Sequence, residues 1–142
     1  MEVKASKAIG YNLGIKMVRG AYMDEERHVA TQKGIESPVF DTIEDTHNCY
    51  NQNMKHIITN MTTHDQFFLA THNVDTVNAA KQLIVEQGFK ESASVCFGQL
   101  RGFSDQVTNS LALDGFRVFK YLPFGPTEQV MPYLVRRGQE SR

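Results

Sequence analysis

The stretch FFLATHNVDTVNAAKQLIVEQG, residues 67–88, predicts one strand followed by one helix. Its first four residues form a short continuous apolar run, which is typical of a strand buried in a parallel sheet. Asn73 can cap the helix that follows, because its side-chain oxygen can accept a hydrogen bond from the first turn. The helix is expected to stop at Gly88, a residue suited to a helix end. Its expected apolar face consists of Val74, Val77, Ala80 and Ile84.

The same order of a short strand and a helix occurs three more times along the chain. We expect the other strands at residues 13–18, 93–97 and 116–120. The first of them leads into a polar connection, residues 23–40, with room for a short helix. Four such units with short links predict parallel strands joined by right-handed crossovers. The pattern therefore indicates a single α/β unit, either a small open sheet or half of a βα barrel.

Two of the remaining helices have clear start signals. We expect one to begin at Asp41, because Glu44 stands three residues later, as in a capping box. Ser104 or Asp105 opens another, after a loop expected at residues 98–102. Apolar residues at helical spacing support the first of these helices. They are Ile43, Tyr50, Met54, Ile57, Ile58 and Met61.

Composition argues against several classes of function. The 15 basic and 16 acidic residues give a net charge of -1, whereas a nucleic-acid or membrane-surface footprint needs a basic excess or stripe. No apolar run approaches the ~18 residues of a membrane span. No targeting leader follows Met1, so we expect any such segment to lie outside this chain. Cys49 and Cys96 form no CxxC pair, so we expect reduced thiols. The five histidines lack the spacing of metal ligands, so we expect no metal site.

Ligand sites of βα folds lie at the carboxyl ends of the strands. All four expected strands end in polar, cationic or aromatic residues, and this convergence favours a ligand site. Structural alternatives stay open: Lys16 could snorkel to the surface and His72 could be a satisfied structural histidine. Tyr22 and Tyr121 could be core aromatics with a solvated hydroxyl. The strand-end residues are Lys16, Arg19, Gly20, Tyr22, Thr71, His72, Asn73, Gln99, Leu100, Arg101 and Tyr121.

The last helix is expected from Thr127 to about Glu140, after a loop at residues 121–126. Two adjacent arginines near its end could simply be a basic helix terminus that complements the helix dipole. However, Tyr133, Arg136, Arg137 and Glu140 fall at i, i+3, i+4 and i+7, and therefore share one face. Two guanidinium groups can hold a carboxylate by bidentate hydrogen bonds, with the glutamate orienting them from behind. This face is therefore typical of a clamp for an amino acid.

With these residues in view, the chain resembles the C-terminal half of the proline dehydrogenase (proline oxidase) family. The motifs occur in family order and cover residues from about 13 to 142. The FGQL form and Lys16 are similar to the eukaryotic, mitochondrial branch. The matching stretches are KMVRGAY (16–22), ATHN (70–73), FGQLRG (97–102), FKYLPFG (119–125) and YLVRR (133–137), followed by Glu140.

The resemblance implies a (βα)8 TIM-like barrel that holds FAD at the carboxyl ends of its strands. The four units here would be strands five to eight, followed by the helix that closes the barrel, so residues 1–142 would be a partial barrel domain. The implied activity is oxidation of L-proline to 1-pyrroline-5-carboxylate, with electrons passed to a quinone. The implied location is the mitochondrial inner membrane on its matrix side, with membrane association only for a full-length enzyme.

The resemblance also assigns roles to the strand-end residues. Lys16, near the flavin N5 edge, and Tyr121 would be catalytic. Arg136 and Arg137 would bind the proline carboxylate, with Glu140 behind them. The walls of the proline site would be Leu100, Tyr121 and Tyr133, with Tyr22 as a lid. The FAD contacts would be Arg19, Gly20, Ala21, Thr71, His72, Asn73 and Gln99.

The length of the chain is the main departure from the family pattern. A closed barrel needs ~250 residues, so 142 residues leave the first four strands absent and the sheet edges open. We expect a fragment that binds FAD weakly, self-associates and is inactive alone. Three alternatives remain: a relative that oxidises hydroxyproline, a non-catalytic half-barrel, and a flavodoxin-like binding module. Tyr121 favours proline over hydroxyproline, because hydroxyproline-preferring relatives carry a small residue there.

Overall fold

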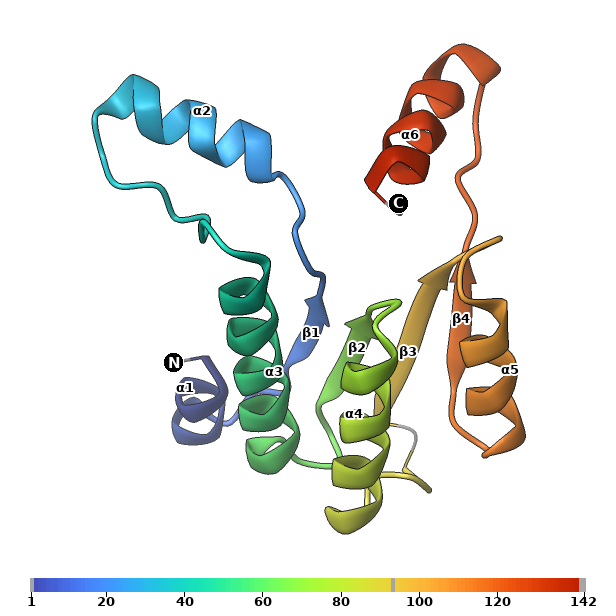
Figure 1. Ribbon diagram of the computed structural model, residues 1–142. Helices are drawn as coiled ribbons and strands as arrows, with labels where there is room; N and C mark the ends of the chain where they lie inside the picture. The colour runs from blue at the N-terminus through green and yellow to red at the C-terminus, as the bar shows by residue number, and fades with distance from the viewer. Residues whose placement is uncertain (1, 93, 141–142) are drawn as a thin grey trace.

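A computed structural model describes residues 2–92 and 94–140. Its centre is a four-stranded sheet in the order β1-β2-β3-β4, with every neighbouring pair parallel (Figure 1). The α/β class and the parallel sheet expected from the sequence are thereby confirmed. The strands are β1 (Gly14–Met17), β2 (Gln66–Ala70), β3 (Val95–Leu100) and β4 (Val118–Tyr121).

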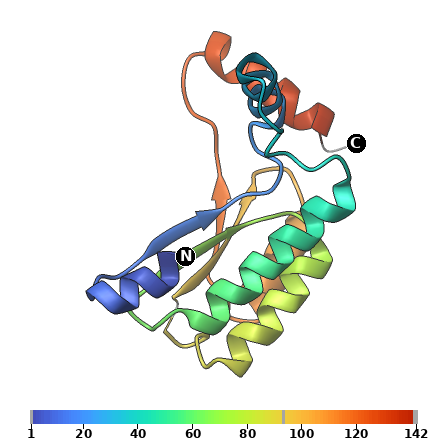
Figure 2. The ribbon, with the colours of Figure 1, turned by 90° about the vertical axis from the view of Figure 1, so that its left-hand side faces the viewer.

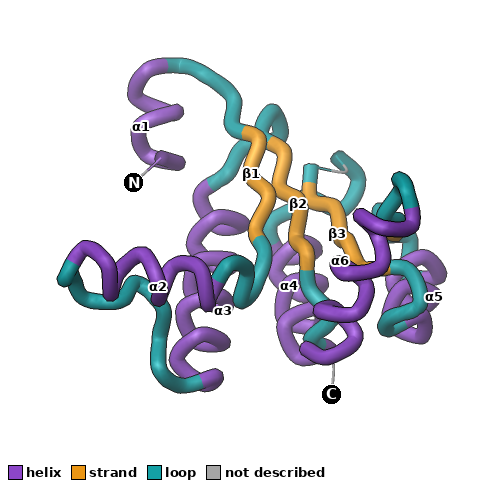
Figure 3. Tube along the Cα trace, turned by 90° about the horizontal axis from the view of Figure 1, so that it is seen from above, coloured by secondary structure: helices purple, strands orange, loops and turns teal. Residues whose placement is uncertain are grey.

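Helices form one layer against the sheet and two arms beyond it. Seen along the strands, α3, α4 and α5 lie side by side on one face of the sheet (Figure 3). The arms are α2, beyond the carboxyl end of β1, and α6, beyond that of β4 (Figure 1). No helix in the described part of the chain is long and apolar enough to cross a membrane. The helices are α1 (Glu2–Ile9), α2 (Met23–Lys33), α3 (Ile43–Asn60), α4 (Val74–Glu86), α5 (Asp105–Leu113) and α6 (Thr127–Glu140).

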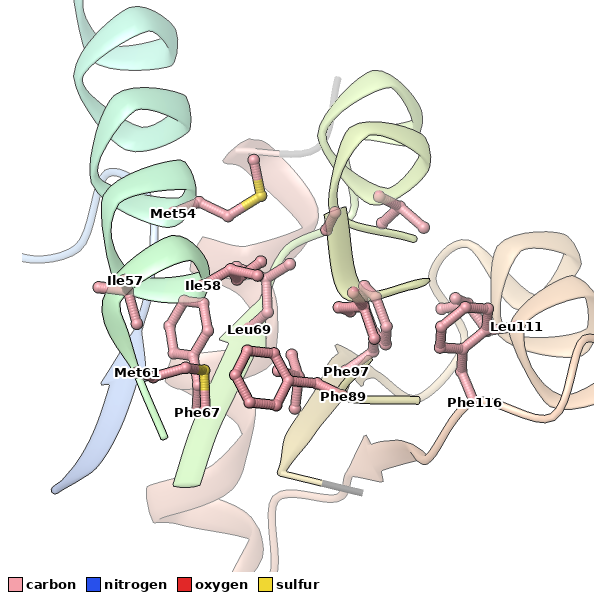
Figure 4. Close-up of a cluster of buried hydrophobic side chains, with 14 of the residues drawn as sticks. Met54, Ile57, Ile58, Met61, Phe67, Leu69, Phe89, Phe97, Leu111 and Phe116 are labelled. Atoms are coloured by element: carbon pink, nitrogen blue, oxygen red, sulfur yellow. The ribbon is translucent and has the colours of Figure 1, made fainter. Parts of the chain in front are cut away.

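The hydrophobic core lies between the sheet and the helices α3, α4 and α5 (Figure 4). Phe67 and Leu69 of β2 and Phe97 of β3 are at most 1% exposed there. Ile58 of α3 and Leu111 of α5, each fully buried, cover them from the helix side. Because side chains alternate along a strand, the residues between these positions point to the opposite face. Among the described residues no helix covers that opposite face, which we call the open face (Figure 3).

The residues of the open face are partly apolar and largely exposed. Phe119 is 47% exposed and Tyr121 is 53% exposed. The Phe68 ring lies 5.8 Å from the Phe119 ring, between their centroids. The outer strands β1 and β4 have no strand partner on their outer edges in the described sheet. The open face and both edges are therefore available to further protein.

Two expected element boundaries were wrong at the carboxyl ends of strands. Residues 98–100 belong to β3 rather than to a loop, because Gly98 pairs with Ala70 and Phe119. Tyr121 belongs to β4, where it pairs with Leu100. The pairing on both sides carries β3 past Gly98, although glycine usually marks a strand end. Ala93, expected to begin β3, lies outside the described residues.

The expected helix starts were partly confirmed. Asn73 caps α4 as expected, with its side chain accepting from the Thr76 N–H at 2.8 Å. Asp41 does not cap α3; the hydroxyl of Thr42 accepts from the Asp45 N–H instead. Thr42 fills this role because its backbone is extended, as a capping residue requires. Two residues expected on buried helix faces are exposed, namely Ile43 at 65% and Val74 at 50%, since each lies in the first turn beyond the sheet.

A buried carboxylate ties β1 to the segment before β2. Asp65 is 5% exposed and accepts hydrogen bonds from the N–H of Leu13 and from the N–H and hydroxyl of Thr62. These bonds measure 2.7, 2.7 and 2.9 Å. Burial would raise the pKa of Asp65, but the hydrogen bonds outweigh it and lower the pKa below its usual value. The ionised form therefore fixes the start of the β1–β2 pair.

We expect Asp65→Asn to lower the free energy of unfolding by about 1–3 kcal/mol, because one donor then faces an amide NH2 group. Urea unfolding of the two chains would measure the difference. Asp41→Asn is the matched control, since Asp41 is exposed. Equal losses in both variants would contradict a specific role for Asp65.

Candidate functional site

The candidate site lies at the carboxyl ends of the four strands, where α2 and α6 rise above the sheet (Figure 2). Strands β1, β2, β3 and β4 all end at this rim, since they are parallel. Lys16, Leu100 and Tyr121 occupy the open face near it, on three different strands. Leu100 and Tyr121 are register partners on neighbouring strands. Parallel pairing thus places residues from different parts of the sequence on one face near the rim.

The rings of Tyr121 and Tyr133 connect the sheet to α6. Their centroids lie 6.1 Å apart with the ring planes at 61°, an edge-to-face arrangement. The guanidinium carbon of Arg137 lies 5.4 Å from the centroid of the Tyr133 ring. A tyrosine of the strand, a tyrosine of the helix and an arginine therefore form one continuous group. This group is the part of the expected amino-acid clamp that the structure brings together.

Arg136 lies on the same helix as Arg137 and is exposed. The helix that carries both arginines stands apart from α3, α4 and α5 (Figures 1 and 2). The side chain of Glu140, expected to orient the arginines, lies outside the described residues. Tyr22, expected as a lid, is 75% exposed at the start of α2. Figure 1 shows α2 beyond the end of β1 and α6 beyond the end of β4.

Tyr22 and Gly20 shape the turn that leads from β1 to α2. Gly20 has φ 64° and Tyr22 has φ 59°, both in the left-handed region. Glycine adopts this conformation freely, whereas tyrosine is strained in it. The turn carries Ala21 between them, and the Tyr22 side chain that it presents is exposed.

Arg19 is held by residues of α3 and α4 that the sequence analysis missed. Its Nη2 donates to the hydroxyl of Thr76 at 2.7 Å, and that hydroxyl donates to Asn51 Oδ1 at 2.7 Å. Its guanidinium carbon lies 4.2 Å from the centroid of the Tyr50 ring. The Tyr50 hydroxyl donates to the carbonyl groups of Met17 and Ala70, at the ends of β1 and β2. Tyr50 was expected only as a core residue, because helical spacing gave no sign of its polar contacts.

The charge of Arg19 has no carboxylate partner among the described residues, whose ion pairs involve Lys81 and Lys120. Burial lowers the pKa of Arg19, and the nearby Tyr50 partly opposes this. Burial likewise raises the pKa of Tyr50, so the phenol stays neutral. The guanidinium is therefore a fixed cation, oriented by neutral groups, and is suited to an anionic ligand.

His72 supports the end of β3. Its Nε2 accepts a hydrogen bond of 3.0 Å from the N–H of Leu100, and its ring stacks on Phe103 with centroids 5.7 Å apart. Burial lowers the pKa of His72, and the positive charge of Lys120 lowers it further. The neutral imidazole thus fixes the position of Leu100. The buried Thr71 beside it accepts at its hydroxyl from the N–H of Asn73, so this segment is rigid.

Gln99 and Lys120 point toward the helix layer rather than toward the open face. Gln99 is 3% exposed, its Oε1 accepts from the Thr108 hydroxyl, and its Nε2 has no hydrogen-bond partner in the described structure. Lys120 forms an ion pair of 2.7 Å with Asp105 and donates to the carbonyl of Phe103 at 2.7 Å. These contacts fix the loop between β3 and α5. The role of Lys120 was missed, because its partners lie on a different element.

The comparisons with known proteins agree on one family. A family model described as proline dehydrogenase matches residues 1–142. Proline dehydrogenase 1, mitochondrial, of Arabidopsis thaliana is 43% identical over 133 residues, which cover 92% of this chain and 27% of that protein. Hydroxyproline dehydrogenase of Homo sapiens is 38% identical over 144 residues, which cover 99% of this chain and 31% of that protein. The chain thus spans less than a third of the length of either curated relative.

A solved structure supports the same relationship. Proline utilization A (PutA) from Bdellovibrio bacteriovorus, inactivated by N-propargylglycine, superimposes with a TM-score of 0.82 at 26% sequence identity. The match covers 96% of this chain and 14% of that protein. The arrangement of strands and helices is therefore shared over almost the whole chain.

We expect the stability of the chain to decrease as the pH falls below about 6.5, the ordinary histidine value. The pKa of His72 is lower in the folded chain than in the unfolded chain. At a pH between these two pKa values the unfolded chain binds the proton more readily, so the free energy of unfolding decreases as the pH falls. The stabilisation by neutral His72 is fully present at a pH above the ordinary histidine pKa of about 6.5. Protonation removes the bond accepted from Leu100, worth about 1 kcal/mol.

Urea unfolding at several pH values would measure this slope. His72→Gln should flatten it, whereas His64→Gln, at an exposed histidine, should leave it unchanged. An identical slope in wild type and His72→Gln would rule out His72 as its source.

Proposed function

The chain belongs to the proline dehydrogenase family, and we propose that it supplies the carboxyl-terminal half of a (βα)8 barrel that oxidises L-proline. In this proposal β1 to β4 are strands five to eight and α6 is the helix that closes the barrel. The open face becomes the barrel interior, and β1 and β4 pair with the strands of the other half. The parallel order of all four strands and the exposed aromatic residues on the open face support this arrangement.

The proposed reaction converts L-proline to 1-pyrroline-5-carboxylate and passes electrons to a quinone. Proline dehydrogenases are flavoenzymes in general, and we propose FAD as the cofactor of this one. The flavin, when bound, supplies the two-electron redox chemistry. The residues of this chain bind and orient the reactants and exclude water.

The residues at the rim fit an anionic dinucleotide. Arg19 is a half-buried cation without a carboxylate partner in the described part of the chain, oriented by Thr76 and Tyr50. We propose that it faces the FAD phosphates, with the flexible backbone of Gly20 and Ala21 beside it. On the next strand, the proposed contacts are Thr71, His72 and Asn73. Gln99, whose buried Nε2 lacks a partner among the described residues, is the proposed contact from β3.

The observation that carries the proposal for the substrate is the continuous group Tyr121, Tyr133 and Arg137. Two tyrosine rings and Leu100 provide an apolar wall for the pyrrolidine ring, and Lys16 stands on the same open face. Arg137 and Arg136 then hold the carboxylate by paired hydrogen bonds. Glu140 completes the clamp in this proposal, and Tyr22 closes over it when α2 moves.

The proposed cellular location is the mitochondrion. Several of the relatives, including those from Arabidopsis thaliana and Caenorhabditis elegans, are named as mitochondrial. Electrons delivered to a quinone would place a full-length enzyme at a membrane that holds quinones.

The isolated chain is proposed to bind FAD weakly, to self-associate through its free edges and to lack activity. An unpaired strand edge is a template for pairing with another chain. Light scattering and flavin absorbance of the purified chain test this directly. Purified chain that is monomeric, yellow and able to reduce a dye with proline would overturn the half-barrel proposal, as would a chain that binds flavin as an open-sheet module.

A second candidate substrate is hydroxyproline, since three of the related proteins are named hydroxyproline dehydrogenases. Tyr121 stands at the position where the proline ring is proposed to pack, and we propose that its bulky ring disfavours a substrate with an added hydroxyl. Proline is therefore the proposed substrate, and kinetic comparison of proline with hydroxyproline distinguishes the two.

We expect Arg136→Met to raise KM for L-proline at least tenfold in an enzyme whose barrel is complete. Removing one arginine of a carboxylate clamp costs about 2–5 kcal/mol, because a charged partner is left unpaired. Steady-state kinetics would measure KM and kcat separately. The control is Arg117→Met, an exposed arginine just before β4, at the opposite end of the sheet. An unchanged KM in Arg136→Met would exclude the clamp.

A further inference from the structure

One aromatic side chain on the open face occupies the space where a neighbouring residue would carry its Cβ. A Cβ built on Gly98 would lie 2.1 Å from Cε1 and 2.4 Å from Cζ of Phe68. Phe68 belongs to β2 and Gly98 to β3, so the ring reaches sideways across the neighbouring strand. It continues toward β4, where its centroid lies 5.8 Å from that of Phe119. The ring therefore spans the middle of the open face.

Glycine at position 98 is required for space and not for backbone conformation. Gly98 lies within β3 and does not have a positive φ, unlike Gly20 in the turn after β1. Any other residue could adopt the same strand backbone. However, real Cβ contacts do not come as close as 2.1 Å, so an added methyl group would displace the Phe68 ring. The missing side chain of Gly98 thus leaves the space in which the Phe68 ring lies.

The ring lies directly below the proposed site. Phe68 is two residues before Ala70, at the end of β2, and Gly98 is two residues before Leu100 on β3. A shallow hollow on the open face is lined by Lys16 and Phe68 together with Gly14, Gln66 and Cys96. On the open face of β2, Phe68 is the next side chain below Ala70. A ligand that enters from the rim therefore meets the Phe68 ring as the floor.

Lys16 lies against the same ring. Its Nζ is 6.0 Å from the centroid of Phe68, and the two residues are register partners on β1 and β2. An ammonium group at this distance is attracted by the negative face of an aromatic ring. The long, exposed side chain of Lys16 has no hydrogen bond or ion pair to other described residues, and its distance from the ring is at the outer limit of a cation–ring contact.

We propose that Phe68, whose ring lies over Gly98, is a positioning residue. Its ring forms the floor of the site and holds the ammonium group of Lys16 beside the ligand. This inference rests on the proposed function, in which Lys16 stands beside the reacting atoms. It adds Phe68 and Gly98 to that proposal, two residues to which the resemblance assigns no contact with substrate or FAD. Gly98 acts only through Phe68, and Phe68 acts through Lys16.

NMR of the chain labelled at lysine tests the position of Lys16 without any cofactor. The protons on Cε of Lys16 should show a ring-current shift and a cross-peak to the ring protons of Phe68. Phe68→Leu should abolish the ring-current shift, and Phe68→Tyr should retain it. Gly98→Ala should also abolish it, because the displaced ring leaves Lys16.

Gly14→Ala is the matched control for the glycine substitution. Gly14 is also in a strand on the open face and lacks a positive φ, but an added Cβ meets no atom within 4 Å. The Lys16 shift should therefore be unchanged in Gly14→Ala. A shift that persists in Phe68→Leu or in Gly98→Ala overturns the proposal, and so does the absence of the cross-peak in wild type, which requires no variant to fold.

A kinetic measurement in the complete enzyme gives a second, independent test. Phe68→Leu should lower kcat/KM for L-proline about two- to fivefold, as expected for the loss of a cation–ring contact. The double variant Gly98→Ala with Phe68→Leu should lose no more kcat/KM than Phe68→Leu alone, because Gly98 acts only through the Phe68 ring. Failure of flavin binding in wild type would refute the proposed function, yet the cofactor-free Lys16 spectra would still decide the role of Phe68.

Discussion

The burial of one face of the sheet against α3, α4 and α5 is the constraint on which the rest of the structure depends. Phe67, Leu69 and Phe97 must face these helices, and side chains alternate along a strand. Lys16 and Tyr121 therefore point to the open face. A shift of one residue in any strand would exchange the two faces and bury these polar groups. The same apolar side chains that stabilise the fold thus determine which residues face a ligand.

The sequence predicted the fold well where a residue's local pattern and its tertiary surroundings agree. The apolar run before Asn73 and the cap at that residue gave β2 and the start of α4 correctly. The end of β3 was misplaced, because Gly98 reads as a strand end while pairing on both sides continues the strand. The start of α3 was misplaced by one residue, because Asp41 and Thr42 are both suitable capping residues and the sequence alone does not distinguish them; in the structure the Thr42 hydroxyl accepts from the Asp45 N–H.

The site was predictable in position but not in its supporting contacts. Parallel strands bring their carboxyl ends together, and this alone located the rim. The partners of Arg19 could not be found in this way, because Thr76 lies 57 residues away and Asn51 lies 32 residues away. Both are on helices, where a polar residue among apolar ones gives no sign of its partner. Phe68 was missed for a related reason: in sequence it is one of several apolar strand residues, and its contact with Gly98 exists only once β2 and β3 pair.

The neutral partners of Arg19 orient its guanidinium group without neutralising its positive charge. A carboxylate in place of Thr76 would orient the guanidinium equally well but would neutralise its charge. A hydroxyl and an amide orient it and leave the charge for a ligand. The cost is that a half-buried cation lacks a counter-ion among the described residues until an anion binds. In the proposed function the FAD phosphates are that anion, and their binding would stabilise the folded state by an amount that grows with the logarithm of the ligand concentration relative to Kd. Under that proposal, the rim is the part of the structure whose stability would depend most directly on a ligand.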